Sequence, residues 1–364
     1  MIKVLTVIGA RPQFIKAAAV SRAIREEFSG QIVELLVHTG QHYDGNMSKI
    51  FFDELDIPQP KHNLEVFGGS HGEMTGRMLE AVEGVLISEQ PDLVMIYGDT
   101  NSTLAGALAA AKLHVPVAHV EAGLRSFNNR MPEEINRIVA DRLSQLLFCP
   151  TETAVNNLSR EGVLNGVENV GDVMLDASLF YRERAKSRST ILQRLGVTHG
   201  GFVLATCHRA ENTDDTTRLH QIIEALAEVS DVLPVVLPLH PRTRKLMLES
   251  QLDKKLKSVK VVEPLPFFDM IALEQSAKVI MTDSGGVQKE AFFFGVPCIT
   301  MRDETEWVET VASGLNHLVG ASKAKILEAF DLCINHVMTE QRPLPYGDGR
   351  ASQRIVQGIL RTLK

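Results

Sequence analysis

The chain has 364 residues, of which 44% are apolar and 23% are charged, and its formal net charge is −7. This length predicts two domains with sizeable cores, and the acidic balance argues against nucleic-acid binding, which needs a broad basic face. No stretch approaches the roughly 20 apolar residues of a membrane span. The N-terminus has no signal-peptide pattern, so we expect a cytoplasmic protein without membrane contact.

Short apolar runs alternate with longer amphipathic stretches from end to end. In chain order the runs cover residues 2–8, 32–37, 92–97, 115–120 and 146–149, then 202–206, 232–239, 259–262, 278–282 and 296–300. Nearly continuous apolar strands separated by helices are typical of parallel sheets buried on both faces. The pattern predicts an α/β protein with two Rossmann-like, doubly wound parallel-sheet domains that face a cleft.

The gap between the two groups of runs sets the predicted domain boundary. We expect an N-terminal domain over residues 1–170 and a C-terminal domain over 171–350, followed by a closing helix over 351–364. The four cysteines have no CxxC spacing, and three of them adjoin apolar runs. Buried free thiols are therefore expected, with neither disulfides nor zinc.

Polar residues gather where the apolar runs end. The clusters cover residues 9–12, 38–42, 98–101, 121–123, 208–209, 240–242 and 283–286. In open α/β sheets, ligands bind outside the carboxyl ends of the strands. These clusters therefore predict the functional site.

The turn at 283–286 follows a strand and precedes a helix. Ser284, Gly285 and Gly286 are suited to a diphosphate at a helix N-terminus, and Glu290 could accept hydrogen bonds from ribose hydroxyls. A plain helix cap made by Asp283 or Ser284 is the alternative.

Two cations follow the first strand, Arg11 and Lys16. They could neutralise phosphate or orient a substrate, or they could simply be solvated. The segment that contains them is neither a P-loop nor a GxGxxG turn.

Three carboxylates could carry acid–base chemistry. Asp99 and Glu121 end neighbouring strands, so they could perturb each other into one acid and one base, and Glu133 opens a helix. Alternatively, Asp99 caps the following helix and Glu133 only complements a helix dipole. His208, at the end of the first strand of the second domain, is a candidate proton shuttle or a structural histidine. No HxH or HExxH pattern supports a metal site.

Together these segments resemble the non-hydrolysing UDP-N-acetylglucosamine 2-epimerase family. The resemblance spans the chain in the ordered motifs GARPQFIK (9–16), GDTNST (98–103), HVEAGLRS (119–126), MPEEINR (131–137), CPTET (149–153), NVGDV (169–173), HRAEN (208–212), LHPRT (239–243), TDSGGVQKEA (282–291) and PYGDGRAS (345–352). It implies a glycosyltransferase-B fold, a last helix that crosses back to the first domain, and a homodimer.

The resemblance also implies roles for residues of this chain. UDP would lie against the second domain, with Ser284, Gly285, Gly286 and Glu290 at the phosphate and ribose. Substrate contacts are implied for Arg11, Lys16, Asp99, Glu121 and His208, and catalysis for Asp99, Glu121, Glu133 and His208.

Two features bear on the substrate. Trp307 stands where the common family pattern has an arginine. The residues of several motifs are closer to those of the branch that acts on UDP-2,3-diacetamido-2,3-dideoxyglucuronate in surface-polysaccharide synthesis.

Some members of the family are activated by a second UDP-sugar. Here Gln41, His42, Arg209 and His240 are its candidate contacts, although Tyr43 follows where many members have arginine.

The implied reaction inverts C2 of a UDP-2-acetamido sugar by eliminating UDP and adding it back through a glycal. No cofactor is expected, because the first turn lacks a dinucleotide fingerprint and no tyrosine begins a Tyr-x-x-x-Lys motif. A retaining glycosyltransferase and a hydrolysing epimerase of the same fold are the alternatives, and a binding-only role is a third.

Overall fold

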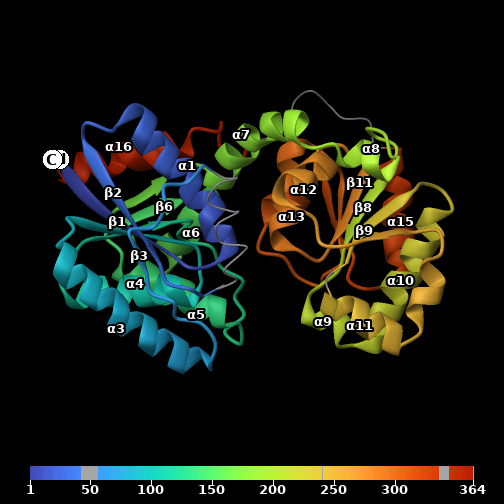
Figure 1. Ribbon diagram of the computed structural model, residues 1–364, viewed down its shortest axis with the longest axis horizontal. Coiled ribbons are helices and arrows are strands. Elements are labelled where there is room, and N and C mark those ends of the chain that lie inside the picture. Colours follow the sequence, from blue (N-terminus) through green and yellow to red (C-terminus); the bar gives the residue numbers. More distant parts are fainter. Residues whose placement is uncertain (42–55, 240, 336–343, 364) are drawn as a thin grey trace. The chain divides into compact units, whose positions relative to one another are not determined.

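The computed structural model in Figure 1 describes the chain except residues 42–55, 240, 336–343 and 364. The chain divides into two compact units, unit 1 with Met1–Ala177 and Leu344–Lys364, and unit 2 with Ser178–Pro343. Our predicted junctions at 170 and 350 lie close to these divisions. Helix α7 (Val173–Arg188) carries the chain from unit 1 into unit 2, and the closing helix α16 (Ala351–Leu363) belongs to unit 1.

Unit 1 is built on a seven-stranded parallel sheet in the order β3-β2-β1-β4-β5-β6-β7. Its strands are β1 (Ile2–Ile8), β2 (Ile32–His38), β3 (His62–Asn63), β4 (Leu93–Tyr97), β5 (Val117–Val120), β6 (Leu146–Cys149) and β7 (Val167–Asn169). The five longer strands fall on the predicted apolar runs. The two edge strands, β3 and β7, were not predicted, because two or three partly exposed residues leave no apolar run.

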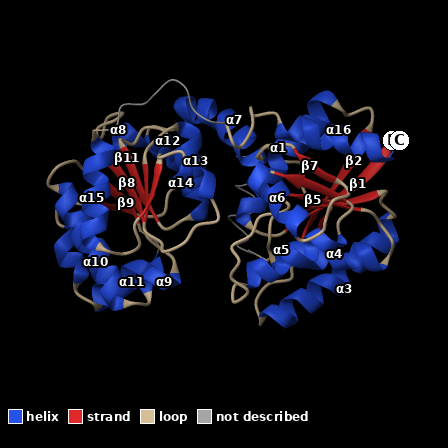
Figure 2. Cartoon of the chain, turned by 180° about the vertical axis from the view of Figure 1, so that it is seen from behind, coloured by secondary structure: helices blue, strands red, loops and turns tan. Residues whose placement is uncertain are grey.

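Helices cover both faces of this sheet (Figures 1 and 2). The helices α1 and α16 pack together on one face, whereas α4 packs between α3 and α5 on the other. The remaining helix bounds of unit 1 are α1 (Arg11–Glu27), α3 (His71–Glu89), α4 (Asn101–Lys112), α5 (Pro132–Leu143) and α6 (Glu152–Arg160). Burial from both sides explains why β4 is apolar along its whole length.

Unit 2 repeats this plan with a six-stranded parallel sheet in the order β10-β9-β8-β11-β12-β13. Its strands are β8 (Val203–Thr206), β9 (Val235–Pro238), β10 (Lys260–Val262), β11 (Val279–Thr282), β12 (Cys298–Thr300) and β13 (Asn316–Leu318). Its helices are α8 (Ile191–Leu195), α9 (Ala210–Thr213), α10 (Thr216–Ser230), α11 (Pro241–Glu249), η1 (Leu252–Leu256), α12 (Phe267–Glu274), α13 (Gly285–Phe294), α14 (Val308–Ala312) and α15 (Lys323–Ile334).

Each unit therefore has a point where the strand order reverses. The first strand of each unit lies inside its sheet, and the fourth pairs with its other side, so β1 adjoins β4 and β8 adjoins β11. This doubly wound arrangement opens a crevice beyond the carboxyl ends of those two strands, where ligands bind. The predicted polar clusters after β1, β4, β8 and β11 all lie at these two reversal points.

The four cysteines are buried free thiols, as predicted. Burial raises the pKa of Cys298 and of Cys333 to about 12, so both stay protonated and unreactive near neutral pH. Within the described residues, no helix is both long enough and apolar enough to cross a membrane.

Glycine at position 358 lets α16 approach β6 closely. A Cβ at Gly358 would lie 2.7 Å from Cε1 and 3.0 Å from Cζ of the fully buried Phe148. We expect Gly358→Ala to lower the free energy of unfolding by about 1 kcal/mol, because overpacking outweighs the gain in helix propensity. Gly84→Ala in α3 is the control. A Cβ at Gly84 would have no described atom within 4 Å, so this substitution should stabilise the protein. Urea unfolding measures both; equal gains in stability would contradict the packing argument.

Candidate active site

In unit 1, a lysine and a glutamate meet above the end of β4. Lys16 of α1 donates to Glu121 Oε2, and the two side chains are 11% and 6% exposed. Both lie over Gly98, where a Cβ would be 3.2 Å from Lys16 Nζ and 3.3 Å from Glu121 Oε2. Gly98 also has a φ of +60°, which favours glycine. The turn before Asp99 is thus shaped to hold this ion pair.

Asp99 is held by the helix α5. Arg137 Nη2 lies 2.5 Å from Asp99 Oδ2, and Asn136 Nδ2 donates to the Asp99 carbonyl oxygen at 2.9 Å. Thr100, and not Asp99, caps α4, because the Thr100 hydroxyl accepts from the backbone N–H of Thr103. The capping alternative for Asp99 is therefore wrong, and its carboxylate points to Arg137 instead.

Glu134, the neighbour of the candidate Glu133, anchors the start of α5. Its carboxylate accepts from Arg137 Nη1 at 2.8 Å and from the backbone N–H groups of Ser126 and Phe127. Glu133 is partly buried and has no hydrogen-bond or ion-pair partner among the residues described. Sequence reasoning missed Glu134 and Arg137 as site residues. Their spacing of three residues, which puts both on one helix face, was the available signal.

Glu121 has a backbone conformation that side-chain-bearing residues rarely adopt. Its φ is +73°, and its N–H donates to the Phe148 carbonyl of β6 at 3.0 Å. Such strain costs of order 1–3 kcal/mol and collects at functional sites. Glu121, which the sequence predicts as a catalytic candidate at a strand end, therefore has a strained backbone.

The end of β1 is tied to the end of β4 by a buried glutamine. Gln13 Oε1 accepts from the N–H groups of Gly9 and Ala10 at 2.8 and 3.0 Å, and its Nε2 donates to the Tyr97 carbonyl at 2.8 Å. This bridge fixes the turn that opens α1. The side chain of Arg11, in the same turn, lies outside the part of the chain that the structure describes, as do His42, Tyr43 and His240.

In unit 2, Asp283 organises the loop after β8. Its carboxylate, which is fully buried, accepts from the backbone N–H groups of His208 and Arg209 at 3.0 Å and from Asn212 Nδ2 at 3.2 Å. His208 Nδ1 lies 3.2 Å from Asp283 Oδ1, and the His208 side chain is 48% exposed. Asp283 therefore orients a histidine that solvent and ligands can reach.

Among the residues that the structure describes, no side chain caps the N-terminus of α13. Ser284 occupies the N-cap position but makes no capping hydrogen bond, and Asp283 faces the β8 loop. The alternative that this turn is a plain Asp or Ser cap is therefore wrong. Gly285 is needed for space, since a Cβ there would lie 2.6 Å from Glu306 Oε1 and 3.3 Å from Trp307 Nε1. Uncapped N–H groups at a glycine turn are suited to an anion.

The family model for UDP-N-acetylglucosamine 2-epimerase matches residues 25–360. The UDP-2,3-diacetamido-2,3-dideoxy-D-glucuronate 2-epimerase of Pseudomonas aeruginosa is 55% identical over 98% of both chains. The Methanocaldococcus jannaschii UDP-GlcNAc 2-epimerase, solved with UDP-GlcNAc and UDP, is 44% identical, has a TM-score of 0.88, and matches over 99% of this chain and all of its own. The Neisseria meningitidis enzyme bound to UDP-GlcNAc is 32% identical, also with a TM-score of 0.88, over 99% of this chain and all of its own.

This chain belongs to the UDP-N-acetylglucosamine 2-epimerase family. It is thus an epimerase by family, which is a class of isomerase. The predicted fold class, two Rossmann-like parallel-sheet units of the glycosyltransferase-B type, is confirmed by these solved relatives.

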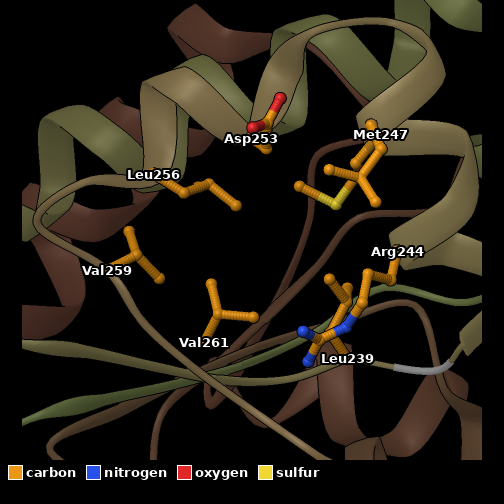
Figure 3. A pocket seen from close by; sticks show the side chains of 8 residues that line it. Leu239, Arg244, Met247, Asp253, Leu256, Val259 and Val261 are labelled. Carbon is orange, nitrogen blue, oxygen red and sulfur yellow. The ribbon is translucent and has the colours of Figure 1, made fainter.

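Unit 2 of this epimerase also contains a cavity of about 340 Å³ (Figure 3). It is lined by Leu239, Arg244, Met247, Leu248, Asp253, Leu256, Val259 and Val261. The lining is mostly apolar and includes none of the predicted site residues. We therefore place the chemistry at the strand ends and not in this cavity.

The Glu134 carboxylate should make the stability of this epimerase depend on pH. Burial alone would raise its pKa, but hydrogen bonds from Ser126, Arg137 and Phe127 outweigh burial and hold the pKa below the ordinary 4.5. Because the pKa is lower in the folded chain, the ionised carboxylate stabilises the fold above about pH 4.5, and this contribution is lost as pH falls through the lowered pKa.

We expect Glu134→Gln to lower the free energy of unfolding by about 2 kcal/mol near neutral pH. The difference from the wild type should shrink below pH 4.5, the ordinary value for this carboxyl. Denaturant unfolding at several pH values measures it. The exposed Glu80→Gln, on α3, is the control and should show no such difference. A constant difference at every pH would contradict this account.

Proposed function

We propose that this epimerase inverts C2 of a UDP-2-acetamido sugar by eliminating and re-adding UDP, without NAD or a metal. The observation that carries the proposal is the charged arrangement at the end of β4. There, the Lys16–Glu121 pair adjoins Gly98 and the Arg137–Asp99 pair holds the next residue, at the strand reversal where ligands of this fold bind.

The chemistry follows from the position of the C2 hydrogen. It is not next to a carbonyl group, so direct removal of the proton is difficult. Cleavage of the C1–O bond sends the electron pair to UDP and leaves positive charge at C1, which makes the C2 proton removable. Loss of that proton to a base forms the C1=C2 bond of a glycal. Protonation of C2 on the opposite face and return of the UDP oxygen to C1 complete the inversion.

Unit 1 would supply the proton-transfer groups. We assign Asp99 and Glu133 to the two faces of C2. Asp99 is a carboxylate that is 30% exposed to solvent and is oriented by Arg137 of α5. Glu133 lies in the first turn of α5, the helix that carries Arg137. Glu121 would orient the sugar or stabilise the ring cation. A positioned acid or base typically contributes about 10²–10⁴-fold in rate.

Unit 2 would hold the departing diphosphate. The uncapped start of α13 at Ser284, Gly285 and Gly286 supports this role, because helix N-termini stabilise negative charge. Glu290, further along α13, would accept from the ribose hydroxyls. His208, oriented by Asp283, would assist the phosphate in leaving.

We propose the 2,3-diacetamido-glucuronate sugar as the preferred substrate. The support is the 55% identity to the Pseudomonas aeruginosa enzyme of that name, against 44% to the Methanocaldococcus jannaschii UDP-N-acetylglucosamine 2-epimerase. The ratio of kcat/KM for the two UDP-sugars tests this preference directly. A higher kcat/KM for UDP-N-acetylglucosamine would reverse the assignment.

The decisive experiment incubates the purified protein with each UDP-sugar alone in D₂O, with no NAD and with a metal chelator present. NMR is expected to show deuterium at C2 of both substrate and product, together with the new manno-configured signals. Release of free sugar and UDP would instead indicate a hydrolysing epimerase. Turnover that begins only when NAD is added would overturn the elimination route.

We also propose a homodimer, and a second UDP-sugar as an activator, with Gln41 as one of its contacts. Gln41 is already oriented, because its Oε1 accepts from the N–H and hydroxyl of Ser102 at 3.1 and 2.8 Å. Sedimentation in solution tests whether the protein is a homodimer. A sigmoidal dependence of rate on UDP-sugar concentration would support the activator, and a hyperbolic dependence would count against it.

A further inference from the structure

A fully buried histidine lies behind the candidate site and has no role in the proposed reaction. His119 of β5 is 0% exposed. Its Nδ1 lies 2.7 Å from Asp141 Oδ1, and its Nε2 lies 2.7 Å from the carbonyl oxygen of Gly98. Gly98 directly precedes Asp99, so this imidazole is hydrogen-bonded to the backbone next to the proposed catalytic carboxylate.

The two partners of His119 determine how many protons its ring carries. A carbonyl oxygen only accepts hydrogen bonds, and so does an ionised carboxylate. A neutral imidazole has one donor and one acceptor, so either neutral tautomer would set a nitrogen lone pair against an oxygen lone pair at 2.7 Å. Both contacts are satisfied only when both ring nitrogens carry a proton.

Asp141 is held in its ionised form. Its Oδ2 lies 2.7 Å from Arg125 Nη1 and accepts from the Gly123 N–H at 3.2 Å. These two contacts, with a guanidinium that stays charged and a backbone N–H, stabilise the ionised carboxylate without any contribution from His119. The oxygen facing His119 is therefore an acceptor.

The charges around His119 balance. Arg125 also forms a two-pronged pair with Glu161, at 2.7 and 2.9 Å. With both ring nitrogens of His119 protonated, the cluster holds two cations, His119 and Arg125, and two carboxylates, Asp141 and Glu161. Cys149, which also lies near Asp141, stays a neutral thiol because burial raises its pKa. Buried charges are tolerated when they are paired and hydrogen-bonded in this way.

We infer that His119 is a permanently protonated imidazolium that fixes the Gly98 carbonyl and so acts as a positioning residue for Asp99. Helix α5 then holds the turn through three contacts, from Asn136 to the Asp99 carbonyl, from Arg137 to the Asp99 carboxylate, and from Asp141 through His119 to Gly98. The positioning role rests on the proposed function of Asp99. The protonation state does not.

Nitrogen NMR of protein labelled with ¹⁵N-histidine tests the charge without any assay of activity. An ordinary histidine, with a pKa of about 6.5, is neutral by about pH 9. We expect one of the 12 histidines to keep both ring nitrogens protonated there, and its signals to vanish in His119→Gln. The exposed His199→Gln should retain them. A wild-type spectrum with no doubly protonated histidine at that pH overturns the inference, whether or not a variant folds.

Kinetics of folded His119→Phe test the positioning role. Loss of the ring N–H that faces the Gly98 carbonyl should free the turn before Asp99, so kcat should fall by about 10²-fold, the cost of a small misplacement of a catalytic group. KM should change little, because the binding groups are untouched. A lower melting temperature with unchanged kcat would show that His119 stabilises the fold but does not position Asp99. Absence of epimerase activity in the wild type would overturn the proposed function and leave the NMR result standing.

Discussion

Asp99→Asn is expected to reduce epimerisation by about 10³-fold and to slow exchange of the C2 hydrogen with solvent in proportion, with little change in KM. The amide has the size of the carboxylate and can still accept from Arg137, whose Nη2 lies 2.5 Å from Asp99 Oδ2. What it lacks is the capacity to take a proton. The substitution therefore isolates proton transfer from binding and folding.

Deuterium incorporation at C2 in D₂O, followed by NMR, is the measurement for this variant. Asp92→Asn is a matched control, because this aspartate is exposed and, among the described residues, accepts from the Lys3 N–H alone. Glu133→Gln belongs in the same series, since a second group must act on the opposite face of C2. Full exchange in Asp99→Asn would remove Asp99 from proton transfer, and full activity in Glu133→Gln would remove Glu133.

Asp283→Ala should destabilise unit 2 by about 4 kcal/mol. The substitution leaves three donors without their acceptor, namely the N–H groups of His208 and Arg209 and the amide of Asn212, and each unsatisfied buried donor costs about 1–3 kcal/mol. It also releases the His208 ring, so turnover should fall even in the protein that remains folded. Denaturant unfolding gives the first effect, and kcat at low temperature gives the second.

Asp215→Ala calibrates this measurement within the same unit. Asp215 caps α10 by accepting from the N–H groups of Thr217 and Arg218, and loss of such an exposed cap costs about 1 kcal/mol. Asp283→Asn keeps one acceptor oxygen and should lie between the two alanine variants. Equal losses for Asp283→Ala and Asp215→Ala would show that Asp283 does not organise the β8 loop.

The fold class, ten of the strands and the polar clusters that follow them could be predicted from the sequence alone. Strands buried on both faces need continuous apolar runs, and each run gives way to polar residues where its strand ends. These are local requirements, so they can be read without knowing which strands are neighbours. The short edge strands β3, β7 and β13 escaped because they have two or three residues each and need no apolar run.

Which charged residues pair with one another follows from the strand order and could not be predicted from the sequence. Arg137 reaches Asp99 across 38 positions of sequence, Lys16 reaches Glu121 across 105, and Asp283 reaches the loop after β8 across about 75. The strained backbone of Glu121 and the two hydrogen bonds of the His119 ring have no local sequence signal either. Such contacts arise where parallel strands end at one edge, and their partners depend on the strand order, which periodicity does not encode.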